Sequence, residues 1–449
     1  MEDFPLWEMG LRREYPVFRG EATADVVIVG GGLTGVSCAA MLSAAGVKVL
    51  LLEAHRLGRG ASWNCTGKVT SQLVGVYETI ADRAGLASAS EYARLLRGAI
   101  TGVAELCHRL GVPTQTDSVH VFAETTDDLP ALHKLCQLET QLGLPVSQAP
   151  DAGGCPFPVE LSLALHHQLL LAPLPYLLAL ADFAAEQGCS IYEHSPVRYI
   201  EGHRVATDQG SVKAAYILLA TGSPVGCTSL PRLAMMQQRT CATITLEGGA
   251  PILNSHLSIR GDELTLRPTR TGALLAWDMG RTGSREHPAR QELLRRTLAA
   301  LLPDMRVVES YIRQDVWSGD GLPLIGPIKP QQSHLLMATG YSGWGVLNSH
   351  LAAKVLTGHI TGHPLSEASL FRPDRPSPKL AEGLRIAAAY AGGIPRLCAP
   401  TCTHMGGKLR YDEESQRWEC PCHGSTFTTL GETMDGPALQ DAQVSAKQR

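Results

Sequence analysis

The chain has 449 residues, more than one hydrophobic core normally fills, so two or three structural units are expected. Hydrophobic residues make up 44% of it and charged residues 18%, a composition typical of globular rather than disordered proteins. The formal net charge of −4 provides no positive field for nucleic acid or for an anionic membrane surface.

The sequence also argues against a transmembrane segment and against secretion. The longest uncharged apolar run in the middle of the chain, residues 169–181, is too short to span a bilayer and contains two prolines. The chain begins Met-Glu-Asp, without the charged and apolar regions of a signal peptide. Most of its twelve cysteines are scattered singly, as in a reducing compartment. We therefore expect a cytoplasmic protein.

The first predicted element is a βαβ unit. An apolar strand at 25–29 precedes an alanine-rich helix at 33–45, and a second buried strand follows at 47–52. Further apolar strands at 216–220 and 334–339 end at glycine-containing turns. Strands so widely separated predict a nucleotide-binding sheet that is interrupted by insertions.

The insertions are expected to build a second, substrate-facing layer of mixed α+β structure. Helical periodicity at 91–110 and 290–302 supports this interpretation. Three prolines within residues 371–378 indicate a linker, and a small separate unit is expected after it.

The turn after the first strand carries a G-x-G-x-x-G pattern made by Gly30, Gly32 and Gly35. The first glycine permits the tight turn, the second lets the backbone approach a diphosphate, and the third allows close packing of helix and strand. Glu53 stands at the end of the next strand, where an acid binds the adenosine ribose. An acidic rather than a basic residue there favours FAD or NAD over NADP.

Three further segments distinguish between FAD and NAD as the cofactor. They are residues 59–72, 217–224 and 338–349. In order and spacing they resemble the D-amino-acid-oxidase-like family of FAD-dependent oxidoreductases, and the resemblance covers residues 1–372. It implies that the last segment brackets the flavin ring, and that the flavin is held non-covalently, since Asn64 stands where some relatives have a linking histidine. No second G-x-G-x-x-G for a pyridine nucleotide occurs in the insertions.

The turn and the resemblance together give the residues expected to bind FAD. They are Gly30, Gly32, Leu33, Thr34, Gly35, Glu53, Lys68, Val197, Thr221, Gly222, Gly340, Tyr341, Gly343, Trp344 and Gly345.

Near the C-terminus, C-x-H and C-x-x-H motifs stand 15 residues apart. The string Cys420-Pro-Cys-His-Gly-Ser resembles a Rieske [2Fe–2S] domain, in which two thiolates hold one iron and two imidazoles the other. The implied ligands are Cys402, His404, Cys420 and His423. A Cys₂His₂ zinc site is the alternative.

The C-terminal unit departs from the Rieske pattern in three ways. Gly407 occupies the position of a loop cysteine, so Cys422 lacks its usual disulfide partner, and Phe427 replaces a tyrosine that often donates to a ligand sulfur. Before Cys402, only residues 384–390 and 394–399 offer strands. We expect a lowered reduction potential and a shortened fold.

The expected fold class is α/β and α+β: a Rossmann-like FAD-binding domain with an inserted substrate domain, plus a small all-β Rieske module. The expected boundaries are an FAD-dependent oxidoreductase domain at 1–372 (FAD-binding parts about 22–80, 190–225 and 315–370; insertions about 81–189 and 226–314), a linker at 373–383 and the Rieske domain at 384–449.

The whole chain resembles a bacterial fusion of these two families. It is expected to be a dehydrogenase that oxidises a small organic substrate, such as an amine or amino acid, and passes electrons from FAD through the cluster to an external acceptor. An oxidase with a degenerate Rieske tail and a non-enzymatic electron carrier remain alternatives. Catalytic residues are not identified; candidates for substrate contacts are Arg260, Arg267, Arg270 and Trp277.

Overall fold

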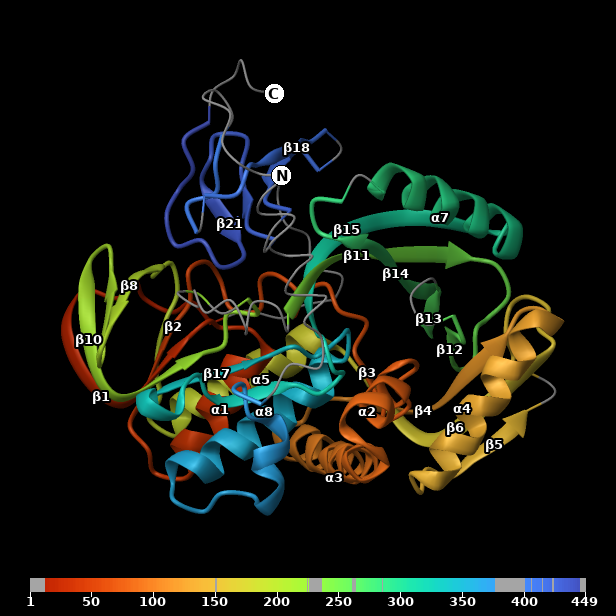
Figure 1. Ribbon diagram of the computed structural model, residues 1–449, viewed down its shortest axis with the longest axis horizontal. Helices are drawn as coiled ribbons and strands as arrows, with labels where there is room; N and C mark the ends of the chain where they lie inside the picture. The colour runs from red at the N-terminus through yellow and green to blue at the C-terminus, as the bar shows by residue number, and fades with distance from the viewer. Residues whose placement is uncertain are drawn as a thin grey trace.

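The computed structural model describes residues 13–149, 152–223, 225, 236–260, 264–284, 286–375, 400–404, 406–413, 415–421 and 424–444. Within these ranges the chain forms sheets of eight, nine and four strands (Figure 1). The expected fold class is confirmed: a mixed nucleotide-binding sheet, an inserted second sheet and a small C-terminal antiparallel sheet. The strands expected at 384–390 and 394–399 lie outside the described residues.

The first sheet has the order β16-β17-β10-β1-β2-β7, and β9 joins β8 to β10. Its five central strands from β17 to β7 run parallel, although they come from distant parts of the chain. The strands are β1 (Gly20–Val29), β2 (Val49–Leu52), β7 (Ser190–Tyr192), β8 (Val197–Glu201), β9 (Arg204–Thr207), β10 (Gly210–Leu219), β16 (Leu324–Pro327) and β17 (Leu335–Thr339).

The apolar second half of β1 is buried on both faces of this sheet. Val26 and Ile28 join the core beneath the helices, whereas Val27 and Val29 join a second core on the opposite face. This double burial explains the continuous apolar run, because a strand covered on both sides has no solvent-facing positions. The helices on this side are α1 (Leu33–Ala44), α3 (Leu86–Leu110), α5 (Pro173–Glu186) and α8 (Gly345–Ile360).

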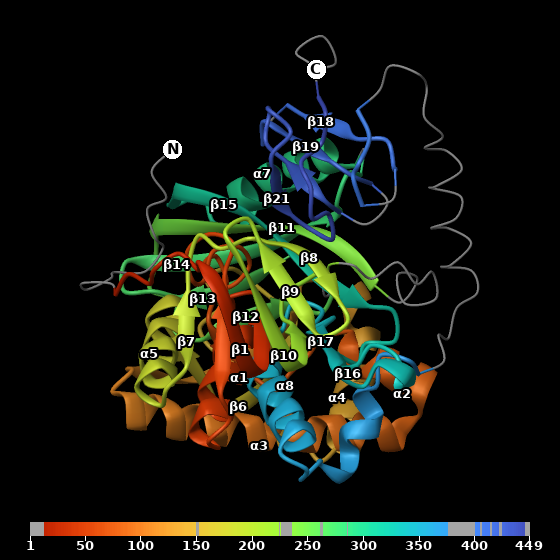
Figure 2. The same cartoon turned by 90° about the vertical axis from the view of Figure 1, so that its left-hand side faces the viewer.

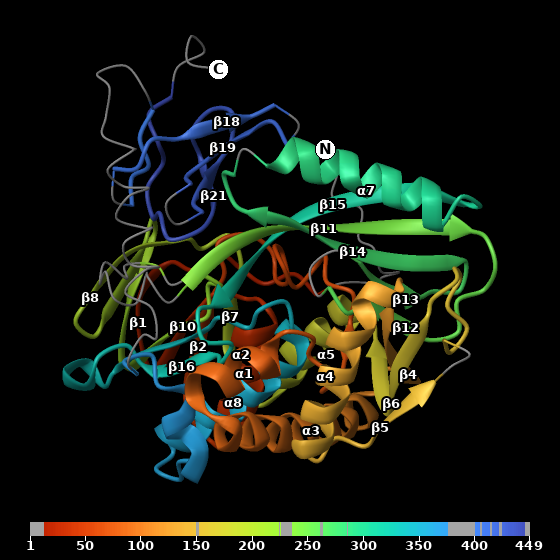
Figure 3. The same cartoon turned by 45° about the vertical axis from the view of Figure 1, so that its right-hand side comes forward.

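The second sheet has the order β15-β11-β14-β13-β12-β4-β6-β3, with β5 beside β6 (Figure 3). Its strands are β3 (Lys68–Val69), β4 (Thr114–Ala123), β5 (Val146–Ala149), β6 (Leu161–Leu171), β11 (Met236–Gly248), β12 (Ser255–Ser258), β13 (Thr265–Pro268), β14 (Gly272–Arg281) and β15 (Met305–Ser318). Helix α7 (His287–Leu301) packs against β14, and α4 (Leu129–Gln141) against β4, β5 and β6. Helix α2 (Val76–Ala84) packs on α3, and short 3-10 helices are η1 (Thr126–Asp128), η2 (Pro330–Gln332) and η3 (Ser366–Phe371).

The C-terminal module lies beside β11, β15 and α7, at the end of the molecule opposite α3 (Figure 2). Its antiparallel strands are β18 (Arg410–Asp412), β19 (Arg417–Glu419), β20 (Thr426–Phe427) and β21 (Thr433–Asp435). It has a core of its own that includes Trp418 and Phe427. Among the described helices of the chain, none combines the length and apolar character needed to cross a membrane.

After η3, a buried ion pair fixes the chain to the loop that precedes β16. The Arg375 guanidinium donates to both carboxylate oxygens of Asp320, at 2.6 and 2.7 Å, and also to the carbonyl oxygens of Leu322 and Pro323. The side chains are 12% and 5% exposed. This is therefore a desolvated contact, and losing one partner would leave the other charge uncompensated.

We expect Arg375→Met to lower the free energy of unfolding by about 3–5 kcal/mol, the usual cost of leaving a buried charge unpaired. The matched control is Arg372→Met, because Arg372 also pairs with a nearby carboxylate, that of Asp374, but its side chain is 54% exposed. The control should leave the urea unfolding midpoint almost unchanged. Equal midpoints for the two variants would contradict the assignment.

Candidate functional site

The glycine-rich turn is built by close contacts that exclude any side chain. Gly30 has a positive φ of 109°, and a Cβ there would lie 2.6 Å from the carbonyl oxygen of Ala220, the residue after β10. A Cβ on Gly35, in the first turn of α1, would lie only 1.9 Å from the Gly30 carbonyl oxygen. The turn therefore presents bare backbone at the N-terminal end of α1, a geometry suited to a diphosphate.

Helix α1 starts at Leu33, directly after the N-cap residue Gly32. The Leu33 amide donates to the hydroxyl of Ser62 at 2.9 Å, although Ser62 lies beyond β2 in the chain. Ser62 was not among the residues expected from the sequence. A serine in a glycine-rich loop carries no local signal for a contact 29 residues away.

The expected flavin-ring segment meets this turn through Tyr341. The hydroxyl of Thr34 is 3.2 Å from the Tyr341 hydroxyl and 3.0 Å from that of Ser349, so α1 and α8 are joined by polar as well as apolar contacts. Trp344 is the N-cap residue of α8, which begins at Gly345. Burial raises the pKa of Tyr341 above its ordinary value, so its hydroxyl stays protonated at neutral pH.

Positive φ angles at Gly340 and Gly343 shape the loop between β17 and α8. After the neighbouring strand β10, the chain turns at Thr221 and Gly222. The Thr339 hydroxyl, at the end of β17, donates to the Gly222 carbonyl. Ala220 in turn donates its amide to Val29 at 2.9 Å. The structure thus brings the two later segments to the same end of the sheet as the Gly-rich turn.

Glu53 directly follows β2 and lies beside the same turn. Its carboxylate accepts the Gly31 amide at 2.6 Å and the His55 amide at 2.8 Å. These contacts fix the carboxylate next to the turn, where an adenosine ribose is expected. Val197 begins β8 and is buried in the core on the opposite face of the sheet.

Lys68 occupies a different layer from the other expected FAD residues. It lies in β3, which pairs with β6 in the second sheet, and its ammonium donates to the hydroxyl of Thr265. Burial lowers the pKa of Lys68 to about 7, the charges of Arg313 and Arg267 act in the same direction, and Asp117 opposes them. Lys68 is therefore poised to exchange a proton near neutral pH.

Two arginines accompany Lys68 in the buried part of the second sheet. Arg267 donates to the carbonyls of Thr66 and Leu171, and Arg313 donates to the Thr243 hydroxyl. Burial lowers the pKa of Arg267 to about 10. The result is a buried group of three basic side chains in which the two arginines lower the pKa of Lys68.

The other candidate substrate contacts have different surroundings. Arg260 forms ion pairs with Asp128 and Glu124 at the surface, and Arg270 is exposed. Trp277 is a core residue of the second sheet. Sequence reasoning missed Arg313 and Asp117, because a charged residue within a strand gives no sign of which layer it will face.

Two tight loops form the candidate metal centre. In the first, Cys402 donates its amide to Gly407 and accepts that of Gly406; in the second, Cys420 donates to Ser425 and accepts from Gly424. A third loop, residues 436–438, covers them, since the Ala438 amide donates to the Ser425 hydroxyl at 3.2 Å. A Cβ on Gly436 would lie 2.5 Å from the Ser425 Cα, so this approach also requires glycine.

The loops bring together the thiols of two of the four expected ligands. The side chains of Cys402 and Cys420 are within hydrogen-bonding distance, and this contact together with burial raises the pKa of the Cys402 thiol. Both ring nitrogens of His404 are buried. His423 and Cys422 lie outside the described residues. Two adjacent thiols and a buried imidazole suit a binuclear iron–sulfur cluster with mixed ligands.

The second cluster loop rests on the second sheet. A Cβ on Gly424 would lie 2.6 Å from the side chain of Gln238 in β11, and one on Gly283, in the loop after β14, would lie 2.9 Å from the Cα of Pro421. Gln238 is paired in register with Val316 of β15, and the next residue, Trp317, forms a bridge with Tyr341. The β11–β15 pair therefore connects the metal centre with the candidate flavin segment.

Comparison with known proteins identifies both parts of the chain. The family profile described as FAD dependent oxidoreductase matches residues 25–358. The chain belongs to this family. The profile described as Rieske [2Fe-2S] domain matches residues 371–446, so the protein is an FAD-dependent oxidoreductase with a C-terminal Rieske domain.

Relatives share one or both parts. The Bacillus subtilis protein YhfW, whose name describes a Rieske 2Fe-2S iron-sulfur protein, is 24% identical and aligns over 95% of this chain and 94% of its own length. Gamma-glutamylputrescine oxidoreductase of Escherichia coli is 27% identical over 76% of this chain and 84% of its own. The structure of glycine oxidase from Geobacillus kaustophilus superposes with a TM-score of 0.66 and is 20% identical. The superposition covers 79% of this chain and 99% of the oxidase chain.

The residues of the two sites fit the two cofactors of these families. The Gly30–Gly35 turn keeps side chains away from the N-terminal end of α1, where the FAD diphosphate would lie, and Glu53 is fixed beside it. The adjacent thiols of Cys402 and Cys420 fit one iron of a [2Fe–2S] cluster, and the buried ring of His404 fits the other.

We expect Gly35→Ala to abolish FAD binding, because its Cβ would collide with the Gly30 carbonyl and open the turn. The matched control is Gly98→Ala in α3, where a Cβ meets nothing within 4 Å. Replacing this helical glycine should stabilise the protein by up to about 1 kcal/mol and leave flavin content unchanged. The ratio of flavin to protein absorbance measures the outcome, and normal flavin in Gly35→Ala would contradict the assigned turn.

Proposed function

We propose that the protein is a cytoplasmic FAD-dependent dehydrogenase that oxidises a small amine or amino acid and delivers electrons, through its Rieske cluster, to an external acceptor. FAD accepts two electrons as a hydride, and a [2Fe–2S] cluster passes electrons singly. A two-electron centre joined to a one-electron centre suits a one-electron acceptor. An oxidase that reduces oxygen directly has no need for the second centre.

The observation that carries the proposal is the contact of the cluster loop with the substrate layer. Gly424 and Pro421 flank the ligand region and pack on Gln238 and Gly283. From Gln238, the β11–β15 pair leads to Trp317 and Tyr341. This continuous packed structure between the two cofactor regions supports electron exchange within one chain.

The buried basic group supports the substrate class. The positive charges of Arg267 and Arg313, which also lower the pKa of Lys68, favour a ligand with a carboxylate. The name of the gamma-glutamylputrescine relative also points to an amine as substrate, which agrees with the proposed class of amines and amino acids. Above a pH of about 7, Lys68 is largely neutral and can accept the proton that an ammonium substrate must lose before oxidation.

The electron path is tested with Cys420→Ser. Under anaerobic conditions, an amine or amino acid substrate found by screening should bleach the flavin at the same rate in the variant and in the wild type. Reduction of cytochrome c should fall by at least about tenfold in the variant, because its cluster is lost. Iron content and the EPR spectrum after dithionite reduction verify that loss.

The matched control is Cys136→Ser, which removes a half-buried thiol from α4, a helix that packs on the second sheet. It should retain iron, flavin and cytochrome c reduction. If Cys420→Ser reduces cytochrome c as fast as the wild type, the proposed path is wrong. Rapid peroxide formation by the wild type, without cytochrome c reduction, would identify an oxidase instead.

A further inference from the structure

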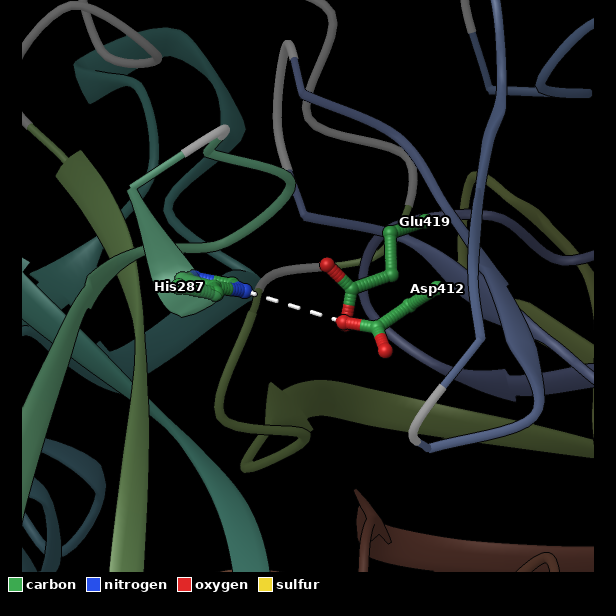
Figure 4. A group of neighbouring side chains, drawn as sticks. All are labelled: His287, Asp412 and Glu419. Carbon is green, nitrogen blue, oxygen red and sulfur yellow. Dashed lines mark ion pairs between the residues drawn. The ribbon is translucent and has the colours of Figure 1, made fainter. Parts of the chain in front are cut away.

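The contact between the Rieske module and the second sheet centres on the loop between β14 and α7. The Gly283 amide donates to the Glu419 carboxylate at 2.8 Å, and the Gly283 carbonyl accepts from Arg410 at 2.8 Å. Both hydrogen bonds cross from the loop to the β18–β19 hairpin. His287 begins α7 beside this loop and faces the same hairpin (Figure 4).

The hydrogen bonds of His287 determine which of its nitrogens carries a proton. Its Nε2 lies 2.9 Å from the Arg281 carbonyl oxygen, and a carbonyl can only accept, so Nε2 must donate. Its Nδ1 faces the Asp412 carboxylate at 3.8 Å. In the neutral ring, Nδ1 would direct a lone pair at a negative oxygen. In the imidazolium, it directs an N–H there.

The charged groups around His287 come from the β18–β19 hairpin and from the second sheet. On β19, Glu419 is bound by Arg417 at 2.6 Å as well as by the Gly283 amide. On β18, Arg410 is directed at the Gly283 carbonyl. On the sheet side, the Asp278 carboxylate is paired with Arg239, and Arg290 of α7 donates to the Asp278 carbonyl. Glu419 and Asp278 are thus each paired with an arginine, and His287 faces the Asp412 carboxylate.

We propose that His287 is a protonation-dependent contact that holds the Rieske module against the substrate layer through Asp412 and Glu419. When the ring is charged, it attracts the hairpin and the two Gly283 hydrogen bonds are kept. When the ring is neutral, a lone pair faces Asp412 and the module separates more often. The contact would make docking of the module respond to pH in the physiological range.

Protonation equilibria support the direction of this response. Burial lowers the pKa of His287, but the neighbouring carboxylates of Asp412 and Glu419 outweigh burial and leave the pKa above its ordinary value of 6.5. If docking raises the pKa of a group, protonation of that group stabilises the docked state. This contribution to the free energy of docking is complete below the pKa of the undocked state. That contribution is lost as the pH rises through the raised value. Docking is therefore strongest in mild acid and weakens above pH 6.5.

Hydrogen exchange of the Gly283 amide reports docking directly, because this amide donates across the contact. We would measure exchange by mass spectrometry on the full-length protein with both cofactors bound, using a peptide that spans residues 281–284, from pH 5.5 to 8.5. After correction for intrinsic exchange, protection should fall as pH rises, by at most about tenfold for each unit by which docking raises the His287 pKa.

His287→Gln and Asp412→Asn should each give low protection that does not depend on pH. The matched control is His133→Gln on the exposed face of α4, which should behave as the wild type. An unchanged Rieske EPR spectrum in every variant shows that the module itself stays folded. The proposal is overturned if wild-type protection does not vary with pH, or if His287→Gln retains the wild-type profile.

A divalent cation is the competing occupant, since nitrogen and oxygen ligand atoms of His287, Asp412 and Glu419 all lie within 4.8 Å of one another. The same exchange measurement distinguishes it. Protection that EDTA removes and Zn²⁺ restores would assign the contact to a metal and refute the proton-based proposal. Protection that EDTA leaves unchanged, with the expected pH profile, supports it.

Discussion

At the turn between β1 and α1, the backbone approaches itself so closely that a single methyl group would not fit. The Gly30 carbonyl lies where a Gly35 side chain would begin, and Ala220 presses on Gly30 from the next strand. This approach sets the height at which α1 leaves the sheet. Because α1 then packs on α8, it also sets where Tyr341 and the start of α8 lie. The cofactor end of the molecule follows from this steric constraint.

The second sheet and the Rieske module are held by other forces. The interior of the sheet contains charged and polar side chains, among them Lys68, Asp117 and Arg267. Burial shifts the pKa of each of these three in the direction that favours its neutral form. The module has a small apolar core of its own, and hydrogen bonds join it to the loop after β14. Such a contact is sensitive to solution conditions, whereas the apolar packing of the first sheet is much less so.

The sequence was informative wherever the determining contacts are local. The Gly30–Gly35 turn, its flanking strand and helix, and the Cys402 and Cys420 loops were predicted because each is specified by a few neighbouring residues. The strand expected at 25–29 extends back to Gly20, since its polar first half pairs with β10. A half-exposed pairing of that kind has no apolar signature.

Contacts between distant residues were not predictable in the same way. Lys68 bonds to Thr265, and His287 faces Asp412, across separations of more than a hundred residues. Nothing in either local sequence indicates its partner, because the pairing is produced by the order of strands in the sheet. The assignment of Lys68 to FAD binding rests on resemblance, and its place in β3 puts it among the strands of the substrate layer.

Residues 62–68 form a short tether between the two layers. Ser62 holds the amide at the start of α1, while Asn64, Thr66 and Lys68 are held in turn by Thr243, Arg267 and Thr265 of the second sheet. Ser62 is therefore anchored to the first layer, and Asn64, Thr66 and Lys68 are anchored to the second. An insertion or deletion of one residue within the tether would move some of these contacts out of position. The length of this segment is thus as constrained as its composition, and movement of either layer is transmitted to the other.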